Sequence, residues 1–252
     1  MKVPLLLIDA GNTRVKWATA HREGNIVSAG EFYTPKTTAV MIRKLAKEYA
    51  KHRVVLSSVV PRLRPYFERA FKDRLQHVEG GSPLLGLTYD YYNPKEIGTD
   101  RLASAVAAHA EGQWPAIVVN CGTATAFTVI DAQGRLCGGA IAPGLHGLQR
   151  GLIESAAQLN ALVLTLTTPQ RASGRSTREA IRAGVVYMYQ GGVKEILRQL
   201  QDELPKDRPA RVLLTGGDAP DLAKALGLED SLRPLLVFEG LRIIGLRTFT
   251  DS

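Results

Sequence analysis

Apolar positions in the first part of the chain follow two spacings. Short apolar runs predict strands at residues 3–9, 13–20, 26–33 and 54–59, with a turn at "HREGN" between the second and the third. Apolar residues at helical spacing predict helices around residues 42–49, 61–71 and 101–111. The predicted order is therefore three strands, followed by helices and strands that alternate.

The same order begins again in the second part of the chain. The predicted strands lie at residues 116–120, after the turn "CGTAT" through Ile130, and, after the turn "DAQG", in "RLCGGAIA". Helices are predicted at residues 145–159 and 176–204. A strand in "RVLLTGGDA", a short apolar run at residues 235–238 and a last helix after it complete the second copy.

This internal repeat is the most informative feature of the sequence. Aligning "LLIDAGNT" with "IVVNCGTA" places Asp9 against Asn120 and Gly11 against Gly122. We therefore expect an α/β protein of two similar domains, residues 1–112 and 113–252, with a cleft between them.

Composition excludes several classes of protein. Apolar runs are shorter than the roughly 18 residues of a membrane span, and "MKVPLLLIDAGN" is too short for a secretory signal, so a cytoplasmic protein is expected. Cys121 and Cys137 lack metal-type spacing and are interpreted as reduced thiols. The net charge of +8 and pI of 9.6 would suit an acidic partner such as a nucleotide, a nucleic acid or a membrane surface. Because Lys and Arg are spread along the chain and mixed with Asp and Glu, solvated helix faces are the preferred explanation of the charge.

The stretch "LIDAGNTRVKW" places a carboxylate and a polar turn at the end of an apolar strand. Glycine lets the chain approach a phosphate, turn N–H groups and the Asn and Thr side chains donate hydrogen bonds, and an Asp holds a metal ion through water. A single such loop could be a plain hairpin. Two in register, with "LTGGDA" after a later strand, favour a polyphosphate site for phosphoryl transfer.

Six segments resemble one family. "DAGNTRVKWA", "NPKEIGTDRLASAVAA", "NCGTATAFTV", "GRLCGGAIAPGL", "GRSTREAIRAGVVY" and "LLTGGDA" occur in order over nearly the whole chain and together resemble the type III pantothenate kinases, of the superfamily of acetate kinase, sugar kinases and actin. The resemblance implies two ribonuclease H-like domains, each a βββαβαβα unit, with ATP in the cleft, and a homodimer. It implies ATP-dependent phosphorylation of pantothenate to 4'-phosphopantothenate, the first step of coenzyme A biosynthesis, and it gives no reason to expect binding to nucleic acid or membrane.

The resemblance also implies roles for individual residues. Asp100 in "GTDR" would be the general base on the pantothenate hydroxyl, and Asp9 would lie near Mg²⁺. The ATP and phosphate contacts would be Asp9, Gly11, Asn12, Thr13, Lys16, Gly122, Thr123, Gly216 and Gly217. The substrate contacts would be Tyr91, Gly98, Thr99, Arg101 and Thr177.

Simpler interpretations of these residues stay open at this point. Asp100 suits the first turn of a helix, with Arg101 a solvated base beside it, and Tyr91 could serve packing alone. Thr177 could belong only to a helix start, because Ser176 and Glu179 have capping-box spacing.

The sequence departs from the family at two positions. Asn120 stands where members usually carry the aspartate associated with a monovalent cation, typically K⁺ or otherwise NH₄⁺, and Thr128 stands where many have another aspartate. A need for that cation is therefore open. Two alternative functions also remain, another small-molecule kinase of the superfamily and a non-catalytic regulatory or accessory relative.

Overall fold

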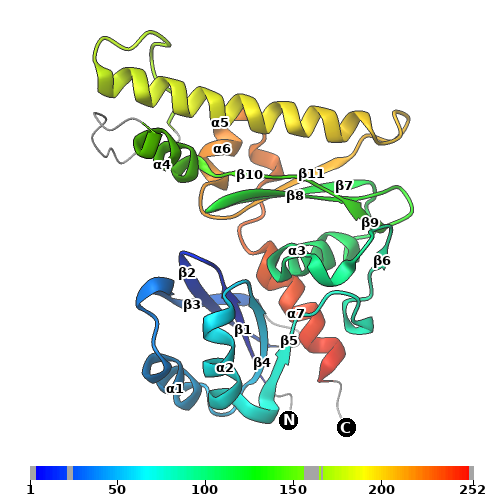
Figure 1. Cartoon of the computed structure of the whole chain (residues 1–252). Coiled ribbons are helices and arrows are strands. Elements are labelled where there is room, and N and C mark those ends of the chain that lie inside the picture. The colour runs from blue at the N-terminus through cyan, green and yellow to red at the C-terminus, as the bar shows by residue number, and fades with distance from the viewer. Residues whose placement is uncertain (1–3, 22–24, 156–164, 166, 250–252) are drawn as a thin grey trace. The chain divides into compact units, whose positions relative to one another are not determined.

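The computed structural model describes residues 4–21, 25–155, 165 and 167–249 (Figure 1). The chain divides into two units. The first unit comprises the residues up to Gly112 and those from Leu235 onward, and the second unit is Gln113–Pro234. The division after Gly112 coincides with the boundary expected from the repeat, whereas the C-terminal segment, expected in the second domain, packs with the first unit.

The first unit contains a sheet whose strands lie in the order β3-β2-β1-β4-β5. Its strands are β1 (Leu5–Ala10), β2 (Arg14–Ala20), β3 (Ile26–Tyr33), β4 (Arg53–Ser58) and β5 (Leu75–His77). The first three strands pair antiparallel, whereas β4 is parallel to β1 and β5 is parallel to β4. The predicted strands are confirmed, and β1 and β4 each contain a continuous apolar run followed directly by a polar residue, as expected for parallel strands that helices cover on both faces.

Helices cover both faces of this sheet. The helices are α1 (Ala39–Glu48), α2 (Arg64–Phe71), α3 (Thr99–Ala110) and α7 (Leu236–Thr248). Ile42 and Leu45 of α1 and Phe67 of α2 share a core with alternate residues of β1 and β4. On the other face, α7 packs against α3, β1 and β4. A Cβ on Gly240 would lie 1.8 Å from the carbonyl oxygen of Ala103, so α7 approaches α3 more closely than any side chain at that position allows.

Several short elements complete the first unit. They are η1 (Thr34–Lys36), η2 (Pro61–Leu63), η3 (Lys72–Arg74), η4 (Pro83–Leu85), β6 (Thr88–Tyr89) and η5 (Pro94–Glu96). The helix predicted at residues 61–71 is thus a short 3-10 turn followed by α2.

The second unit repeats the strand order of the first. Its strands are β7 (Ala116–Cys121), β8 (Ala124–Ile130), β9 (Arg135–Gly138), β10 (Ile141–Pro143) and β11 (Arg211–Thr215). Antiparallel pairs join β7 to β8 and β8 to β9, and β11 is parallel to β7. A single parallel bridge between Leu214 and Leu232 stands where the first unit has its fifth strand. The predicted α/β duplication is therefore confirmed.

Three helices accompany this second sheet. They are α4 (Leu145–Ser155), α5 (Thr177–Asp202) and α6 (Ala219–Leu226), and the 3-10 turn η6 (Glu229–Ser231) follows them. Val186 and Tyr189 of α5 are buried in one cluster with Ile117, Val119 and Phe127 of the sheet. The part of the predicted helix 145–159 beyond Ser155, and most of the predicted "HREGN" turn, lie outside the described residues.

Two further predicted elements differ from the structure. The third strand in "RLCGGAIA" is divided into β9 and β10 at Gly138 and Gly139, which have φ angles of +157° and +148°. The apolar run at residues 235–238 is not separate from the last helix but forms its beginning, because the buried residues continue at helical spacing through Leu241 and Ile244. Within the ranges described, no helix is long and apolar enough to cross a membrane.

Candidate active site

Asp9 lies one residue before the end of β1, where the structure surrounds it with polar groups of the first unit. Its partner in the parallel strand β4 is Ser57. The Ser57 hydroxyl donates a hydrogen bond to Oδ1 of Asp9 at 3.2 Å and lies 3.0 Å from the hydroxyl of Thr99, the first residue of α3. The carboxyl ends of two parallel strands and the start of a helix thus meet at one place, which is where ligands bind in open α/β sheets.

The carboxylate of Asp9 is electrostatically unusual. Burial, reinforced by the nearby carboxylate of Asp100, raises the pKa of Asp9 from 3.8 to about 7, although the Ser57 hydrogen bond and Lys16 oppose this rise. Asp9 nevertheless keeps some exposure to solvent. A carboxylate that is desolvated and close to a second carboxylate is a typical partner for a cation.

Asp100 lies at the start of α3, two residues after Gly98. It lies in the first turn of α3, where an acidic side chain suits the helix dipole. A Cβ on Gly98 would lie 2.8 Å from Oδ1 of Asp100, so the carboxylate occupies space that only glycine leaves open. Arg101, the next residue, is only 6% exposed and has polar partners. This burial excludes the interpretation of Arg101 as a solvated base.

The loop between β1 and β2 is a hydrogen-bonded turn. The N–H of Gly11 donates to the carbonyl of Arg14 at 3.0 Å, and the hydroxyl of Thr34 donates to the carbonyl of Gly11 at 2.7 Å. Asn12 and Thr13 at the tip are exposed, and Lys16 on β2 pairs in register with Asp9. The turn is thus fixed by a backbone hydrogen bond of its own and by the Thr34 hydroxyl, while Asn12 and Thr13 at its tip are exposed.

Two glycines, Gly144 and Gly216, pack closely against the backbone of the corresponding loop in the second unit. The N–H of Gly122 donates to the carbonyl of Ala124 at 3.1 Å, and Thr123 accepts from the N–H of Gly144 at 3.2 Å. A Cβ on Gly144 would lie 2.2 Å from the carbonyl oxygen of Gly122, and one on Gly216 would lie 2.2 Å from that of Cys121. The "CGTAT", "APGL" and "TGGD" segments therefore meet through backbone contacts.

A buried tyrosine supports this second loop. The hydroxyl of Tyr189 in α5 lies 2.7 Å from that of Thr125 and also hydrogen-bonds with Cys121, so it contacts both ends of the loop. Burial raises the pKa of the Cys121 thiol to about 12, which keeps it protonated and unreactive. Both cysteines are free, as the sequence indicated.

The structure gives two other predicted site residues, Tyr91 and Thr177, no hydrogen bond to the Asp9 cluster within the described residues. Among the described residues, Tyr91 makes no hydrogen bond to the cluster; it is half-buried in the segment before η5, and the adjacent Tyr92 is fully exposed. Thr177 is the exposed first residue of α5, where Ser176 caps the helix by accepting from the N–H of Glu179. Oε2 of Glu179 accepts from the N–H of Arg175, one residue earlier than in the standard capping box.

The two positions that depart from the family lie in the second sheet. Asn120 is one residue before the end of β7, matching Asp9 in β1, and it pairs in register with Thr215 of β11. Gly216 and Gly217 follow directly, and Gly216 has a φ of +102°, which favours glycine. Thr128 lies within β8 and is buried, with a polar partner.

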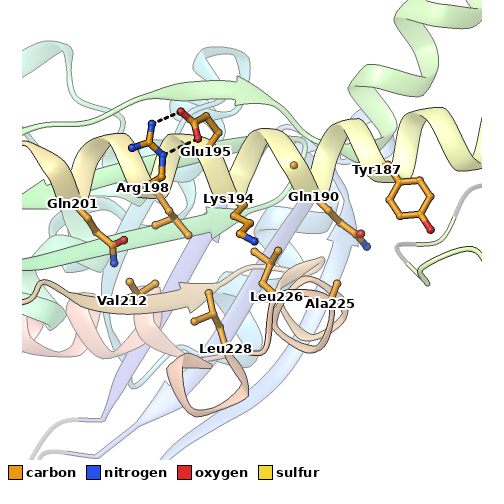
Figure 2. Close-up of a pocket in the computed structure, with 12 residues that line it drawn as sticks. Tyr187, Gln190, Lys194, Glu195, Arg198, Gln201, Val212, Ala225, Leu226 and Leu228 are labelled. Atoms are coloured by element: carbon orange, nitrogen blue, oxygen red, sulfur yellow. Dashed lines mark hydrogen bonds and ion pairs between the residues drawn. The ribbon is translucent and has the colours of Figure 1, made fainter. Parts of the chain in front are cut away.

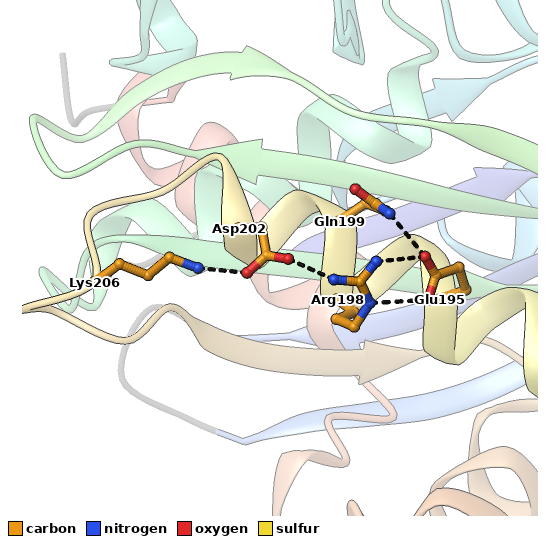
Figure 3. A network of polar contacts seen from close by, with 5 residues as sticks. All are labelled: Glu195, Arg198, Gln199, Asp202 and Lys206. Atoms are coloured by element: carbon orange, nitrogen blue, oxygen red, sulfur yellow. Dashed lines mark hydrogen bonds and ion pairs between the residues drawn. The ribbon is translucent and has the colours of Figure 1, made fainter.

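A cavity of about 620 Å³ lies elsewhere in the second unit (Figure 2). It is bounded by one face of α5, Val212 of β11 and the end of α6, and none of the sequence-predicted site residues lines it. Arg198 of the cavity lining forms ion pairs with Glu195, which also lines the cavity, and with Asp202 (Figure 3). Asp202 also pairs with Lys206. These ion pairs are solvent-exposed and contribute little to stability.

The donor chemistry of the Asp9 cluster fits Mg²⁺. Mg²⁺ binds through one or two carboxylates and keeps several waters, instead of occupying a cage of protein ligands. The part of the chain that the structure describes contains no group of three or more His, Cys, Asp or Glu side chains that could enclose a metal ion. Asp9 would provide an oxygen ligand for such an open site, and the nearby carboxylate of Asp100 adds negative charge.

Ser57 is the residue of this cluster that the sequence analysis did not identify. A signal was present, since Ser57 and Ser58 are polar residues at the end of an otherwise apolar strand. The parallel pairing that brings Ser57 beside Asp9, which is 48 positions away, could not be derived from the sequence alone.

Comparisons with known proteins identify the family. The family model of the type III pantothenate kinases matches residues 5–199. A type III pantothenate kinase of Akkermansia muciniphila is 39% identical over 241 residues, covering 94% of this chain and 96% of the relative. One of Methylacidiphilum infernorum is 33% identical over 241 residues, covering 96% and 88%.

The structural comparison agrees at the level of the fold. A Campylobacter jejuni structure named as a conserved Baf family transcriptional activator has a TM-score of 0.61 at 19% identity and covers 98% of this chain and 100% of that chain. At this identity the likeness shows only that the two proteins share a fold. Family model and full-length relatives together leave no doubt about the assignment: the chain belongs to the type III pantothenate kinases.

Proposed function

We propose that this protein transfers the γ-phosphoryl group of ATP to the hydroxyl of pantothenate, which yields 4'-phosphopantothenate and ADP and begins coenzyme A biosynthesis. The family supports the reaction and its substrates. The structural observation that carries the proposal is the Asp9, Ser57, Thr99 and Asp100 cluster, since phosphoryl transfer needs a cation site and a base close together. This cluster favours an enzyme over a non-catalytic relative.

Asp100 acts as the general base in this proposal. Its carboxylate accepts the proton of the pantothenate hydroxyl while the bond from that oxygen to the γ-phosphorus forms and the bond from the γ-phosphorus to the ADP oxygen breaks. Gly98 leaves the space in which the Asp100 carboxylate lies. Arg101, Thr99 and, by family resemblance, Tyr91 and Thr177 contact pantothenate.

Asp9 holds Mg²⁺ in the same proposal. When bound, Mg²⁺ neutralises charge on the phosphates of ATP. The loop residues Gly11, Asn12 and Thr13, with Lys16, bind phosphate in the first unit, and Gly122 and Thr123 do so in the second. Gly216 and Gly217 lie on the adenosine side, and the ATP cleft expected between the two domains stays a prediction.

The remaining expectations are part of the proposal and rest on the family resemblance alone. The enzyme works as a homodimer in the cytoplasm, without membrane or nucleic acid as a partner. Its requirement for K⁺ or NH₄⁺ is weakened by Asn120, as argued in the Discussion.

The direct test is product formation. Purified protein with Mg²⁺, ATP and pantothenate should give 4'-phosphopantothenate by mass spectrometry, and Asp100→Asn should lower kcat by roughly 10² to 10⁴-fold, the usual size of a general-base contribution. Asp73→Asn, an exposed acid of the same unit, is the matched control and should leave kcat unchanged. Absence of product with the parent protein, or an Asp100→Asn variant of normal kcat, would refute the assignment.

Asp9 can be tested separately from Asp100. Asp9→Ala should weaken binding of Mg²⁺-ATP more than binding of pantothenate, because Asp9 acts on the nucleotide side. Calorimetry with each ligand measures both affinities. The reverse order would remove Asp9 from the phosphate site.

A further inference from the structure

Ser57 links two functional groups that come from distant parts of the chain. Its side chain is 0% exposed and lies between the carboxylate of Asp9 at 3.2 Å and the hydroxyl of Thr99 at 3.0 Å. Thr99 directly precedes Asp100. A single hydroxyl therefore connects the cation-binding carboxylate at the end of β1 to the helix start that carries the base.

The direction of these hydrogen bonds is determined by their chemistry. A hydroxyl has one proton, and the Ser57 proton is donated to Oδ1 of Asp9. The Thr99 hydroxyl must then donate to the Ser57 oxygen. The result is an ordered chain from Thr99 through Ser57 to Asp9, in which the last bond ends on a carboxylate and each bond strengthens the next.

The neighbouring serine shows that this arrangement is specific. Ser58 follows Ser57 in β4, but its hydroxyl accepts from the N–H of Val60 at 3.3 Å and makes a local turn. In the second unit, the position that corresponds to Ser57 by parallel pairing is Thr215, beside Asn120. The repeat thus places a hydroxyl next to the strand-end polar residue in both sheets.

We propose that Ser57 is a positioning residue for phosphoryl transfer, whose hydroxyl fixes the orientation of the Asp9 carboxylate toward Mg²⁺ and ties it to the Thr99-Asp100 helix start. The proposal rests on the proposed function for the identity of the metal nucleotide. It makes no demand on which alcohol accepts the phosphoryl group.

The experiment measures ADP binding by calorimetry with Mg²⁺ and, separately, with EDTA. Ser57→Ala should weaken binding of Mg²⁺-ADP about tenfold, the size expected for losing a hydrogen bond to a charged group, and should leave binding of metal-free ADP unchanged. The parent protein should bind ADP more tightly with Mg²⁺ than without it. Ser58→Ala is the matched control and should behave like the parent in both titrations.

Thr99→Val tests the connection to the helix. It removes the donor to Ser57 and leaves the Ser57 bond to Asp9, so its effect on Mg²⁺-ADP binding should be smaller than that of Ser57→Ala. Because the bonds are in series, the double variant should bind Mg²⁺-ADP no more weakly than Ser57→Ala alone. Ser57→Thr, which keeps the hydroxyl, should restore binding to within about threefold of the parent.

Several results would overturn the proposal. The first is that Ser57→Ala binds Mg²⁺-ADP as tightly as the parent, and the second is that it loses ADP affinity equally with and without Mg²⁺. The third is that the affinity losses of Ser57→Ala and Thr99→Val add in the double variant. The fourth is that Mg²⁺ does not change the affinity of the parent for ADP. A parent protein that shows the predicted pattern but makes no 4'-phosphopantothenate would refute the proposed function and leave the role of Ser57 standing.

Discussion

The carboxylates of Asp9 and Asp100 repel each other inside the first unit, and this repulsion adds to burial in raising the pKa of Asp9 to about 7. The two residues come from the end of β1 and the start of α3, so the fold itself brings like charges together. Such an arrangement lowers the stability of the free protein at neutral pH and favours binding of a cation.

The pH dependence of the free energy of unfolding should reflect the ionisation of Asp9. Its pKa is raised from 3.8 to about 7, so between these values the folded protein holds a proton that the unfolded chain has released. Stability therefore decreases as the pH rises through this window. In the absence of Mg²⁺ and nucleotide, Asp9→Asn should flatten this decrease and raise the free energy of unfolding at pH 8 by roughly 2–4 kcal/mol.

Urea unfolding at pH 5 and pH 8 measures this effect. Asp73→Asn serves again as the control, because the Asp73 side chain is exposed on η3. If Asp9→Asn lost stability between the two pH values as steeply as the parent, Asp9 would not be the titrating group.

Gly98→Ala should damage catalysis without damaging nucleotide binding. The new methyl group would lie 2.8 Å from Oδ1 of Asp100, closer than such contacts occur, so the carboxylate must move. We expect kcat to fall at least tenfold, since small displacements of a catalytic group cost about this much or more. Gly184→Ala, in open space on α5, is the matched control and should leave kcat unchanged. Normal kcat in Gly98→Ala would show that the position of Asp100 is not critical.

Local sequence patterns predicted most of the elements but not all of their partners. The strands β1 to β4 and the helix α5 were predicted to within a few residues, because strand-like and helical spacings leave a direct trace in the sequence, whereas the three-residue strand β5 was not predicted. The membership of α7 in the first unit depends on packing against α3, for which the small residues Ala103 and Gly240 leave no distinctive pattern. Spacing along one helix does not say which sheet that helix covers.

The residues of the candidate site also fall into two groups, those that the sequence identified and those that it did not. Asp9 and Asp100 stand in motifs that can be recognised from the sequence, whereas Ser57 and Tyr189 act through contacts across 48 and 64 positions. Such long-range contacts follow from strand pairing and helix packing, which no local pattern encodes.

Tyr189→Phe should loosen the loop between β7 and β8, which is the proposed phosphate loop of the second unit. The variant keeps the ring but loses the hydroxyl that bonds to Thr125 at 2.7 Å and to Cys121. We expect a loss of about 1–2 kcal/mol in the free energy of unfolding and a rise of severalfold in KM for ATP, with a smaller change in KM for pantothenate. Tyr187→Phe is the control, because that hydroxyl, on the same helix, donates to the carbonyl of Pro169 instead. If Tyr189→Phe and Tyr187→Phe had the same KM for ATP, this would argue against a role of Tyr189 in the loop.

The last prediction concerns the monovalent cation. Asn120 occupies the same place in β7 that Asp9 occupies in β1, but it offers only a neutral carbonyl oxygen where family members usually have a carboxylate. Attraction between unit charges about 4 Å apart is about 4 kcal/mol at an effective dielectric near 20, and desolvation offsets part of it. Losing that charge is enough to empty a weak cation site.

We therefore expect the parent enzyme to work without K⁺, because the groups assigned to catalysis, Asp9, Asp100, Arg101 and Thr123, are all retained. Initial rates should change little when K⁺ is replaced by Na⁺ or a bulky organic cation at constant ionic strength. Asn120→Asp should create a K⁺ response, since it restores a full negative charge at the end of β7. Strong K⁺ activation of the parent protein would contradict this prediction, and it would mean that amide and backbone oxygens suffice to hold the cation.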